Sequence, residues 1–468
     1  MLVSAYHLPA LSRPPTATWS YGAGWGGIGV RIPQLTPAML AEQIEALRSA
    51  RETELAHRPV AEIVEVIGRV ADRLLDRDDP IRREAEAVLP LVTGSAPEMV
   101  RMVLDRMASD WRADALWSLL RAEFGDPGVL DGFRPRSVAA GQAVAVGPIL
   151  TTHIFSGNVP GVAVTSLIRS LLVKSAALGK TAAGEPVLPA LFARALAEED
   201  EGLGSCIAIT YWPGGDEALE KLALDAADAV VVYGGQESIA AVRARTPISA
   251  RFIGYGHRLS FGVLAREALE GEGAAASAAH AALAVSTFDQ QGCVSPHLFY
   301  VEEGGGRSAA EWATLLAGSM EALEMKLPRG QLSPREAAAI RQLRGEMEFA
   351  QLGGSGVELH VSSEGTGWTV IHDPDPTFEA SCLNRVVRVK PVTELMEVVD
   401  HARVIAPVLQ SVGMAGPIER LAPLADALAR LGASRITSLA ALPWPPPSWH
   451  HDGSPPLVEL VRWCDWEG

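Results

Sequence analysis

Short apolar runs that alternate with helical stretches between about residues 137 and 264 constrain the fold of this chain more than any other feature. The runs Ile207–Thr210 and Ala229–Tyr233 are bounded by turn residues, as buried parallel strands are. Helical stretches are predicted at residues 189–198 and 217–224. Strands that alternate with helices form βαβ units around a parallel sheet, with ligand loops at the carboxyl ends of the strands. We therefore expect an α/β protein with a nucleotide-binding domain here, although no GxGxxG motif follows a strand.

The chain before this segment is predicted to be irregular first and helical afterwards. Residues 1–35 are rich in proline and glycine, which disfavours regular structure. The pair Thr36-Pro37 is typical of a helix N-cap followed by proline at the first helical position. Apolar residues at steps of three and four from Val60 to Leu74 predict a helix with one buried face. The run from Val144 to Leu150 is the first predicted strand.

After residue 265 a second mixed α/β region is predicted, followed by a tail. Helices are expected at residues 273–285, 309–325 and 335–349, and strands at residues 298–302, 356–361, 368–371 and 386–392. The segment 443–453 contains too many prolines for a helix or a central strand, so we expect it to be extended before a last element at residues 457–463.

The predicted loop around Cys293 is the candidate for the centre of the chemistry. It lies between a helical segment and an apolar strand. Gly292 removes a side chain that would block approach to the thiol. Backbone N–H groups after the cysteine can lower the pKa of the thiol and hold a developing oxyanion. The alternative is a structural cysteine, because free cysteine is among the most buried residue types.

Composition excludes several classes of function. The net charge of -16 argues against unspecific binding to nucleic acid or to an anionic membrane. The 4 cysteines are widely separated, which favours neither a disulfide framework nor a zinc site and indicates a reducing, cytoplasmic location. His450, His451 and Asp452 are adjacent and lack the spacing of metal ligands, so no metal is expected. The sequence contains neither a signal peptide pattern nor a membrane span.

Four blocks, in this order, resemble the aldehyde dehydrogenase superfamily, and most closely its acyl-CoA reductase branch, which includes the fatty-acid reductase component of bacterial bioluminescence. They are residues 155–161, residues 178–186, residues 228–239 and the pair Gly292-Cys293. The resemblance implies an aldehyde-dehydrogenase-like fold with a Rossmann-type nucleotide-binding domain and an α/β catalytic domain. We accordingly expect residues 1–265 to form the helical region and nucleotide-binding domain, and residues 266–440 the catalytic domain. Residues 441–468 then form a tail that packs on the first domain or on a partner subunit.

The same resemblance implies roles for single residues. Cys293 is the expected nucleophile, and Asn158 the donor of an amide hydrogen bond to the oxyanion. Lys180 and Thr181 are expected to bind the adenosine ribose, and Gly234 with Gly235 to pass under the cofactor pyrophosphate. The alternatives are a turn residue for Asn158, between glycine and proline, and a solvated side chain for Lys180.

Three positions depart from the family pattern. Ala183 stands where enzymes that use NAD commonly carry a glutamate on the ribose; because no carboxylate repels a 2′-phosphate there, we expect NADPH as the cofactor. Residues 253–257 lack the glutamate that activates water in hydrolytic members, which favours thioester chemistry. Residues 382–387 lack the glutamate and phenylalanine that contact the nicotinamide ribose, so the nicotinamide pose does not follow from the family.

Together these observations predict NADPH-dependent reduction of an acyl-CoA, a fatty acyl thioester, to the aldehyde through a cysteine acyl-enzyme. The acyl group comes from acyl-CoA or from a partner synthetase, and the family resemblance favours a homo-oligomer. His257 or His153 would shuttle protons, although each can equally be a packed or solvated histidine. The alternatives are an NAD(P)-dependent aldehyde dehydrogenase that oxidises aldehydes, and a non-catalytic scaffold of the same fold.

Overall fold

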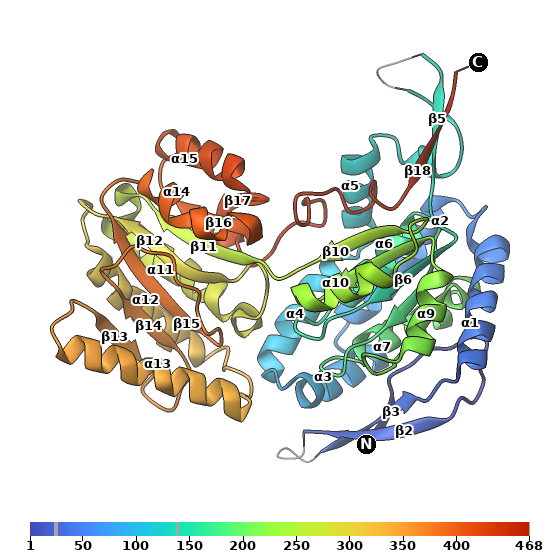
Figure 1. Cartoon of the computed structure of the whole chain (residues 1–468), viewed down its shortest axis with the longest axis horizontal. Helices are drawn as coiled ribbons and strands as arrows, with labels where there is room; N and C mark the ends of the chain where they lie inside the picture. The colour runs from blue at the N-terminus through green and yellow to red at the C-terminus, as the bar shows by residue number, and fades with distance from the viewer. Residues whose placement is uncertain (23–26, 137–139, 468) are drawn as a thin grey trace.

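The computed structural model describes residues 1–22, 27–136 and 140–467, which form two lobes, each built around a mostly parallel sheet (Figure 1). The sheet of the first lobe has five parallel strands in the order β10-β9-β6-β7-β8. The winding direction therefore reverses between β6 and β9, and ligands of such sheets bind at this reversal, beyond the carboxyl ends of the strands. The strands are β6 (Leu150–Ile154), β7 (Ala176–Lys180), β8 (Ile207–Thr210), β9 (Ala229–Tyr233) and β10 (Arg251–Tyr255).

Helices alternate with these strands as the sequence predicts. The predicted helices at residues 189–198 and 217–224 are present with slightly wider bounds. The largest hydrophobic core of the protein joins this sheet to the N-terminal helices. The helices that connect the strands are α6 (Val162–Leu172), α7 (Leu188–Glu199), α8 (Glu201–Ser205), α9 (Glu217–Asp225) and α10 (Gln236–Arg245).

The N-terminal helical region also follows the prediction. The hydroxyl of Thr36 accepts a hydrogen bond from the backbone N–H of Met39 at 3.3 Å, and Pro37 occupies the first turn of α1. The apolar stripe from Val60 to Leu74 is buried along one face of α2. The helices are α1 (Pro37–Ala50), which continues into a π-helical turn (Arg51–Leu55), then α2 (Val60–Leu75), α3 (Pro80–Thr93), α4 (Pro97–Asp110) and α5 (Ala113–Phe124), followed by a 3-10 turn (Pro127–Leu130).

The sheet of the second lobe has seven strands in the order β13-β14-β15-β12-β11-β16-β17. All neighbours are parallel except β13 and β14. Its strands are β11 (Leu259–Leu264), β12 (Pro296–Glu302), β13 (Glu358–Val361), β14 (Thr369–His372), β15 (Val386–Val392), β16 (Leu409–Ala415) and β17 (Arg435–Ser438). Its helices are α11 (Gly271–Ser286), α12 (Ala309–Glu324), α13 (Pro334–Leu352), α14 (Glu397–Ala402) and α15 (Ile418–Leu431), with 3-10 turns at Arg266–Leu269, Thr287–Gln290, Arg403–Val408 and Leu439–Ala441.

The crossing from the first lobe to the second falls earlier than residue 265. Strand β10 ends at Tyr255 in the first sheet, and β11 begins at Leu259 in the second. Residues 259–264 are apolar on both faces, which is why the sequence did not distinguish a strand of one sheet from a strand of the other.

The irregular arm expected for residues 1–35 is wrong. Strands β1 (Leu2–Ser4), β2 (Thr16–Tyr21) and β3 (Ile28–Pro33) form a small sheet in the order β1-β3-β2. It is attached to the first lobe, where the backbone of His7 pairs with Ile209 at the edge of β8. Pro9, Pro14 and Pro15 lie between β1 and β2, and Pro33 is the last residue of β3. The glycine-containing residues 23–26 lie outside the described residues.

The single strand expected from Val144 to Leu150 is also wrong, because Gly147 and Pro148 interrupt it. A Cβ on Gly147 would lie 1.8 Å from the carbonyl oxygen of Val173, so only glycine permits the close approach. The run belongs to β5 (Gln142–Val146) and β6. Strand β5 lies in a second small sheet, in the order β18-β5-β4, with β4 (Arg134–Pro135).

The C-terminal tail returns from the second lobe to the first (Figure 1). Its last strand is β18 (Arg462–Trp466), antiparallel to β5, rather than the element at residues 457–463 that the sequence predicts. Residues 457–460 instead form turns buried against the first lobe. No helix among the described residues is both long and apolar enough to cross a bilayer.

Candidate active site

The loop that carries Cys293 lies between α11 and β12, and a second loop holds its backbone. Three consecutive residues just before Cys293 adopt positive φ, as do three just before β15: Phe288, Asp289 and Gln290, and Leu383, Asn384 and Arg385. Each such non-glycine residue costs roughly 1–3 kcal/mol. Arg385 Nε donates to Asp289 Oδ1 at 2.8 Å, and Gln290 Nε2 donates to the carbonyl of Val386 at 2.9 Å. These bonds between the loops stabilise a backbone that local preference disfavours.

The peptide of Cys293 is attached to the second sheet through one serine. Ser260 Oγ, on β11, donates to the carbonyl oxygen of Cys293 at 2.7 Å and accepts from the backbone N–H of Ser411 at 3.0 Å. The side chain of Cys293 remains partly exposed. Cys293 lies on a loop, as expected, and lines two cavities.

An oriented amide faces the thiol. Gln410, fully buried at the start of β16, places Nε2 3.9 Å from Cys293 Sγ, a distance at which an amide donates a weak hydrogen bond to sulfur. Ser434 Oγ donates to Gln410 Oε1 at 2.7 Å, which fixes the amide so that its N–H group points toward Cys293. Nothing near Cys293 in the sequence predicts this contact.

The thiol is protonated at rest. Burial, followed by the nearby carboxylate of Asp452, raises the pKa of the Cys293 thiol to about 11. The hydrogen bond from Gln410 and the charge of Arg258 lower this pKa but do not outweigh the burial. At neutral pH, formation of the thiolate therefore requires removal of a proton from the thiol.

Asn158 joins the first lobe to the catalytic loop. It follows β6, and its Nδ2 donates to the carbonyl oxygen of Gln291 at 3.0 Å. Ser156 Oγ donates to Asn158 Oδ1 at 2.7 Å, so the amide orientation is fixed. One N–H of this amide is used by Gln291, which leaves the second for a ligand. Asn158 and Cys293 line the same cavity.

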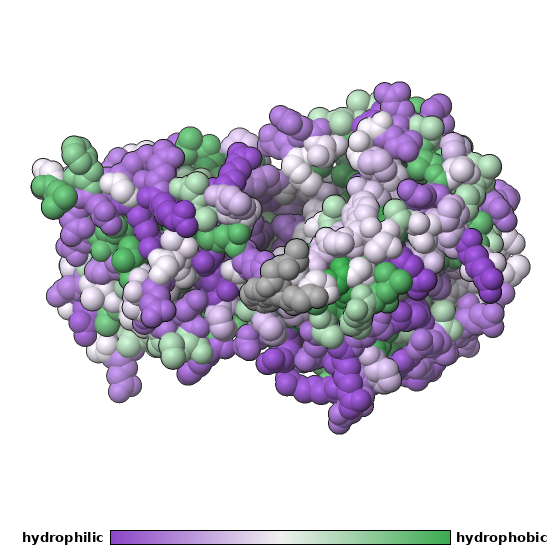
Figure 2. Space-filling model, turned by 90° about the horizontal axis from the view of Figure 1, so that it is seen from below, coloured by the Kyte–Doolittle hydropathy of each residue, from purple (hydrophilic) through white to green (hydrophobic). Residues whose placement is uncertain are grey.

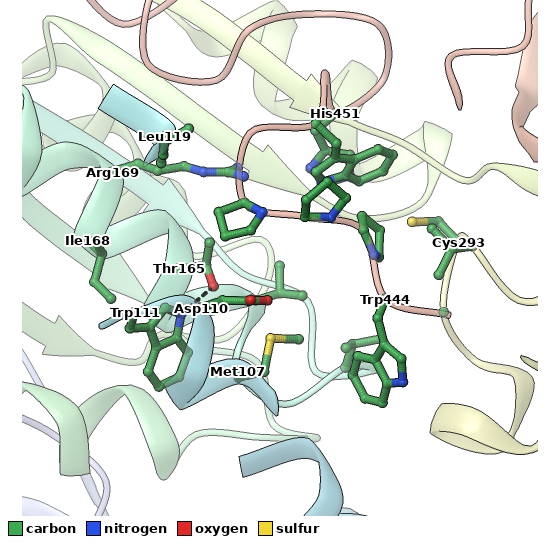
Figure 3. A pocket seen from close by; sticks show the side chains of 18 of the residues that line it. Met107, Asp110, Trp111, Leu119, Thr165, Ile168, Arg169, Cys293, Trp444 and His451 are labelled. Atoms are coloured by element: carbon green, nitrogen blue, oxygen red, sulfur yellow. Dashed lines mark hydrogen bonds between the residues drawn. The ribbon is translucent and has the colours of Figure 1, made fainter. Parts of the chain in front are cut away.

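Cys293 lies on the boundary between two cavities at the hollow between the lobes, which Figure 2 shows from below. One cavity is mainly apolar and is closed on one side by the proline-rich tail (Figure 3). Its apolar side chains come from α4, α5, α6, the catalytic loop and the tail: Met107, Trp111, Leu116, Leu119, Val159, Val162, Ile168, Phe288, Val294, Pro443, Trp444, Pro445, Pro446, Pro447 and Trp449.

The other cavity is polar and extends from Cys293 to the carboxyl ends of β6, β9 and β10. It is lined by side chains and glycines that follow these strands, together with the catalytic loop: Ser156, Asn158, Tyr233, Gly234, Gly235, Tyr255, Gly256, His257, Arg258, Gln290, Gln291 and His297. The thiol thus meets a hydrocarbon-like environment on one side and a hydrogen-bonding environment on the other.

Gly234 and Gly235, after β9, line the polar cavity, whereas Lys180 and Thr181, which the sequence predicts to bind the ribose, are not part of its lining. Gly235 precedes α10, and no side chain caps the free N–H groups of that helix, an arrangement that suits an anion. Lys180 ends β7, where its Nζ lies 5.5 Å from the ring centroid of Tyr211 and burial lowers its pKa. Thr181 Oγ1 donates to the carbonyl of Thr210 at 3.2 Å, so this buried hydroxyl is already engaged.

The two candidate histidines have different environments. His257 lines the polar cavity. His153 is fully buried, with its ring nitrogens 3.0 Å from Ser166 Oγ and 2.9 Å from Ser170 Oγ. Burial lowers the pKa of His153 to about 3, and the residue lines neither cavity beside Cys293. Its position does not support the expected proton shuttle. The sequence missed His297, which lines the polar cavity and whose pKa burial lowers to about 4.

The tail contributes residues that sequence proximity could not reveal. Asp452 pairs with Arg258 Nε at 2.9 Å, and the ring of His451 stacks on Tyr255 with centroids 4.2 Å apart. The only signal was the proline-rich composition, which predicts an extended segment but not its contacts. Within residues 1–22, 27–136 and 140–467, no group of three or more His, Cys, Asp or Glu side chains is placed to hold a metal ion.

The sequence is similar to a family of known enzymes over most of its length. The model of the family described as acyl-CoA reductase (LuxC) matches residues 55–463. A long-chain acyl-protein thioester reductase of Aliivibrio fischeri is 26% identical over 416 residues, which cover 87% of this chain and 82% of the relative. The protein of that description from Photobacterium phosphoreum is 24% identical over 379 residues, covering 80% and 74%.

Solved aldehyde dehydrogenases have the same fold. Aldehyde dehydrogenase 21 from Physcomitrella patens, in complex with succinate, has a TM-score of 0.77 at 14% identity and covers 99% of this chain and 98% of its own. Indole-3-acetaldehyde dehydrogenase complexed with NAD+ has a TM-score of 0.76 at 12% identity, covering 98% and 95%. The aldehyde-dehydrogenase-like fold expected from the sequence is confirmed. The chain belongs to the LuxC family of acyl-CoA reductases.

Proposed function

We propose that this protein reduces a fatty acyl thioester to the aldehyde with NADPH, through an acyl-enzyme on Cys293. The observation that carries the proposal is the position of Cys293 between an apolar cavity and a polar cavity. An acyl chain fits the first environment and a nicotinamide ring the second, so the carbonyl carbon and the hydride donor would meet at the sulfur. The names of the bacterial relatives, long-chain acyl-protein thioester reductases, support the same chemistry.

The residues present fit a dinucleotide. Gly234 and Gly235 offer a turn without side chains at the winding reversal, and an added Cβ on Gly235 would meet nothing within 4 Å. The uncapped start of α10 would hold the pyrophosphate, and Lys180 would bind oxygens of the adenosine ribose. When bound there, NADPH supplies the hydride that reduces the acyl-enzyme.

The side chains of the protein would carry out the remaining steps. The Cys293 thiol loses its proton, attacks the carbonyl carbon of the thioester, and forms a new carbon–sulfur bond as the bond to the donor thiol breaks. The departing thiolate takes up a proton. The amide of Asn158 donates to the oxygen that becomes negative during attack. After reduction, the carbon–sulfur bond to Cys293 breaks, releasing aldehyde and regenerating the thiol. His257 is placed to exchange a proton in the polar cavity.

The preference for NADPH has support in the loop after β7. Ala183 carries no carboxylate, and its carbonyl accepts a hydrogen bond from the Tyr21 hydroxyl at 2.8 Å. Glu185 is buried, and its Oε1 accepts from the backbone N–H groups of Val187 and Leu188 at 2.9 Å and 2.7 Å. The nearest carboxylate of this loop is thus used to cap α7, so no carboxylate of the loop is directed at a 2′-phosphate.

The acyl donor is acyl-CoA or an acyl group on the thiol of a partner synthetase. Both present the same thioester carbon to Cys293, so they differ only in contacts outside the cavities. The sheet of β4, β5 and β18 exposes Phe133, Trp463 and Trp466, which suits an interface between copies of the chain. We therefore propose a homo-oligomer.

The test follows the acyl group. Radiolabelled acyl-CoA is incubated with the protein without NADPH, the label is located by peptide mapping, and NADPH is then added while aldehyde is measured. Label on Cys293, followed by its conversion to aldehyde, is the expected result. The variant Cys293→Ser should neither retain label through thioester formation nor produce aldehyde. The matched variant Cys464→Ser, at an exposed cysteine, should retain the label and produce aldehyde as the wild type does. Label that NADPH does not remove would refute the reductase.

Oxidation of aldehydes is the second candidate, because the tail brings a carboxylate near the thiol. Residues 253–257 carry no acid, whereas the carboxylate of Asp452 is near enough to raise the pKa of the Cys293 thiol and would be the base that activates water. Burial raises the pKa of Asp452, and its ion pair with Arg258 lowers that pKa without outweighing the burial. Formation of NADPH from NADP+ and an aldehyde, abolished in Asp452→Asn, would favour this candidate over reduction.

A further inference from the structure

A buried histidine, His297, forms part of the wall of the polar cavity. It is the second residue of β12, is 4% exposed, and lines the cavity together with Cys293. The backbone N–H of Ser381 donates to its Nδ1 at 3.1 Å. Within residues 1–22, 27–136 and 140–467, no group forms a hydrogen bond with its Nε2. The ring is therefore held at one nitrogen, and the other remains for a ligand.

The hydrogen bond from Ser381 determines where the proton of this ring lies. A nitrogen that accepts a hydrogen bond carries no proton, so the single N–H of the ring is at Nε2 and the imidazole is neutral. Burial, followed by the charge of nearby His257, lowers the pKa of His297 to about 4, which agrees with a neutral ring. His297 therefore offers a permanent hydrogen-bond donor rather than a proton shuttle.

Two other donors in the lining of this cavity are already engaged with protein groups. Gln290 Nε2 donates to the carbonyl of Val386 at 2.9 Å, and its Oε1 accepts from the N–H of the same residue at 3.0 Å. Arg258 Nε pairs with Asp452 at 2.9 Å. A buried N–H without an acceptor costs free energy, so Nε2 of His297 is suited to an acceptor atom of a ligand.

The imidazole is fixed relative to the reacting sulfur. Ser381 lies in the segment before β15, where its Oγ accepts from the N–H of Leu383 at 2.9 Å. The same segment holds the catalytic loop through Arg385 and Asp289. The donor on His297 and the thiol of Cys293 are thus positioned by one set of contacts.

The position of His297 selects the part of the cofactor that it meets. The hydride-donating carbon of the nicotinamide ring has to approach Cys293 in this cavity. The carboxamide is attached to the carbon next to the hydride donor, whereas the ribose is attached to the nitrogen across the ring. We propose that Nε2–H of His297 donates to the carboxamide oxygen of the bound nicotinamide and so orients the ring toward the acyl-enzyme. This inference rests on the proposed function and adds a cofactor-binding residue to it.

A neutral donor suits this acceptor in both redox states of the cofactor. Loss of hydride turns the nicotinamide ring into a cation, which a protonated histidine beside it would repel. The neutral imidazole of His297 exerts no such repulsion, so its hydrogen bond persists while the hydride leaves.

The experiment measures the binding of two nucleotides without acyl-CoA. Calorimetry gives the Kd of NADPH and of thio-NADPH, whose carboxamide oxygen is replaced by sulfur, a weaker acceptor. The wild type should bind NADPH ~5-fold more tightly than thio-NADPH. His297→Phe should raise the Kd of NADPH ~10-fold and bind both nucleotides equally. Glutamine can accept from Ser381 and donate into the cavity, so His297→Gln should keep the preference. His280→Gln, at an exposed histidine of α11, should match the wild type.

Binding and turnover separate the two proposals. If His297→Phe loses the preference for NADPH but the wild type reduces no acyl-CoA, the reductase fails and the contact of His297 stands. If the wild type reduces acyl-CoA while His297→Phe keeps the preference, or raises both Kd values equally, the contact is refuted and the reductase stands. Equal binding of both nucleotides to the wild type refutes the contact, and absence of NADPH binding refutes both proposals. Melting temperatures establish folding, and His297→Leu replaces His297→Phe if the latter does not fold.

Discussion

Replacement of Gln410 by leucine tests whether its amide stabilises the Cys293 thiolate. The side chains have similar volume, but leucine has no N–H to donate. A hydrogen bond to a charged acceptor contributes about 1.5–3 kcal/mol, and the distance of 3.9 Å places this one at the lower end. A contribution of about 1.4 kcal/mol corresponds to one pKa unit. We therefore expect Gln410→Leu to raise the pKa of the thiol, already about 11, by about one unit.

The rate of alkylation of Cys293 by iodoacetamide, measured between pH 7 and pH 10, reports this change, because only the thiolate reacts. At pH 9 the rate should fall about tenfold in Gln410→Leu. Ser434→Ala removes the hydroxyl that orients the amide. This variant should lower the alkylation rate less than Gln410→Leu does. Asp452→Asn removes a negative charge near the thiol and should raise the alkylation rate. An unchanged rate in Gln410→Leu, with an altered rate in Asp452→Asn, would refute the reasoning. Melting temperatures of all variants establish that each is folded.

The remaining predictions concern the oxyanion, the cofactor and two ion-pair clusters. Asn158→Ala should lower kcat about 100-fold or more, measured by steady-state kinetics, and should slow the labelling of Cys293 by acyl-CoA. Lys180→Ala should raise the Kd for NADPH in a fluorescence titration, and wild type should bind NADPH more tightly than NADH; the reverse order would remove the cofactor assignment. Arg385→Ala leaves Asp289 and Glu324 without their buried partner and should destabilise the protein by about 3 kcal/mol in urea. Burial would raise the pKa of Glu302, but hydrogen bonds from Arg266 and Arg420 outweigh it and lower the pKa to about 2. Its contribution to stability is therefore present above about pH 4.5 and lost as pH falls toward 2, and Glu302→Gln should flatten that part of the melting-temperature profile.

The sequence predicted those parts of the fold that local pattern determines. The cap at Thr36, the buried stripe from Val60 to Leu74 and the strand Ala229–Tyr233 depend on residues within one or two turns of each other, and all are present. The small N-terminal sheet was missed because its strands are stabilised by pairing with each other and by contact with the edge of β8, not by their own composition.

The site was predictable only where family motifs mark it. Cys293, Asn158 and the glycines after β9 stand in recognisable blocks, and the structure brings them to one cavity. Gln410 lies 117 residues after Cys293 in the sequence. Its significance comes from its burial and from the side chains around it, which no window of sequence contains.

The chain connects the two lobes by two separate segments. It enters the second lobe just after Tyr255 and leaves it through the tail, and Arg258 of the first segment pairs with Asp452 of the second. Two connections joined side by side act as a hinge with a fixed axis, which permits opening and resists twisting. Because these segments also line the two cavities beside Cys293, the proposed function leads us to expect that exchange of spent nucleotide and departure of aldehyde occur in a single opening movement.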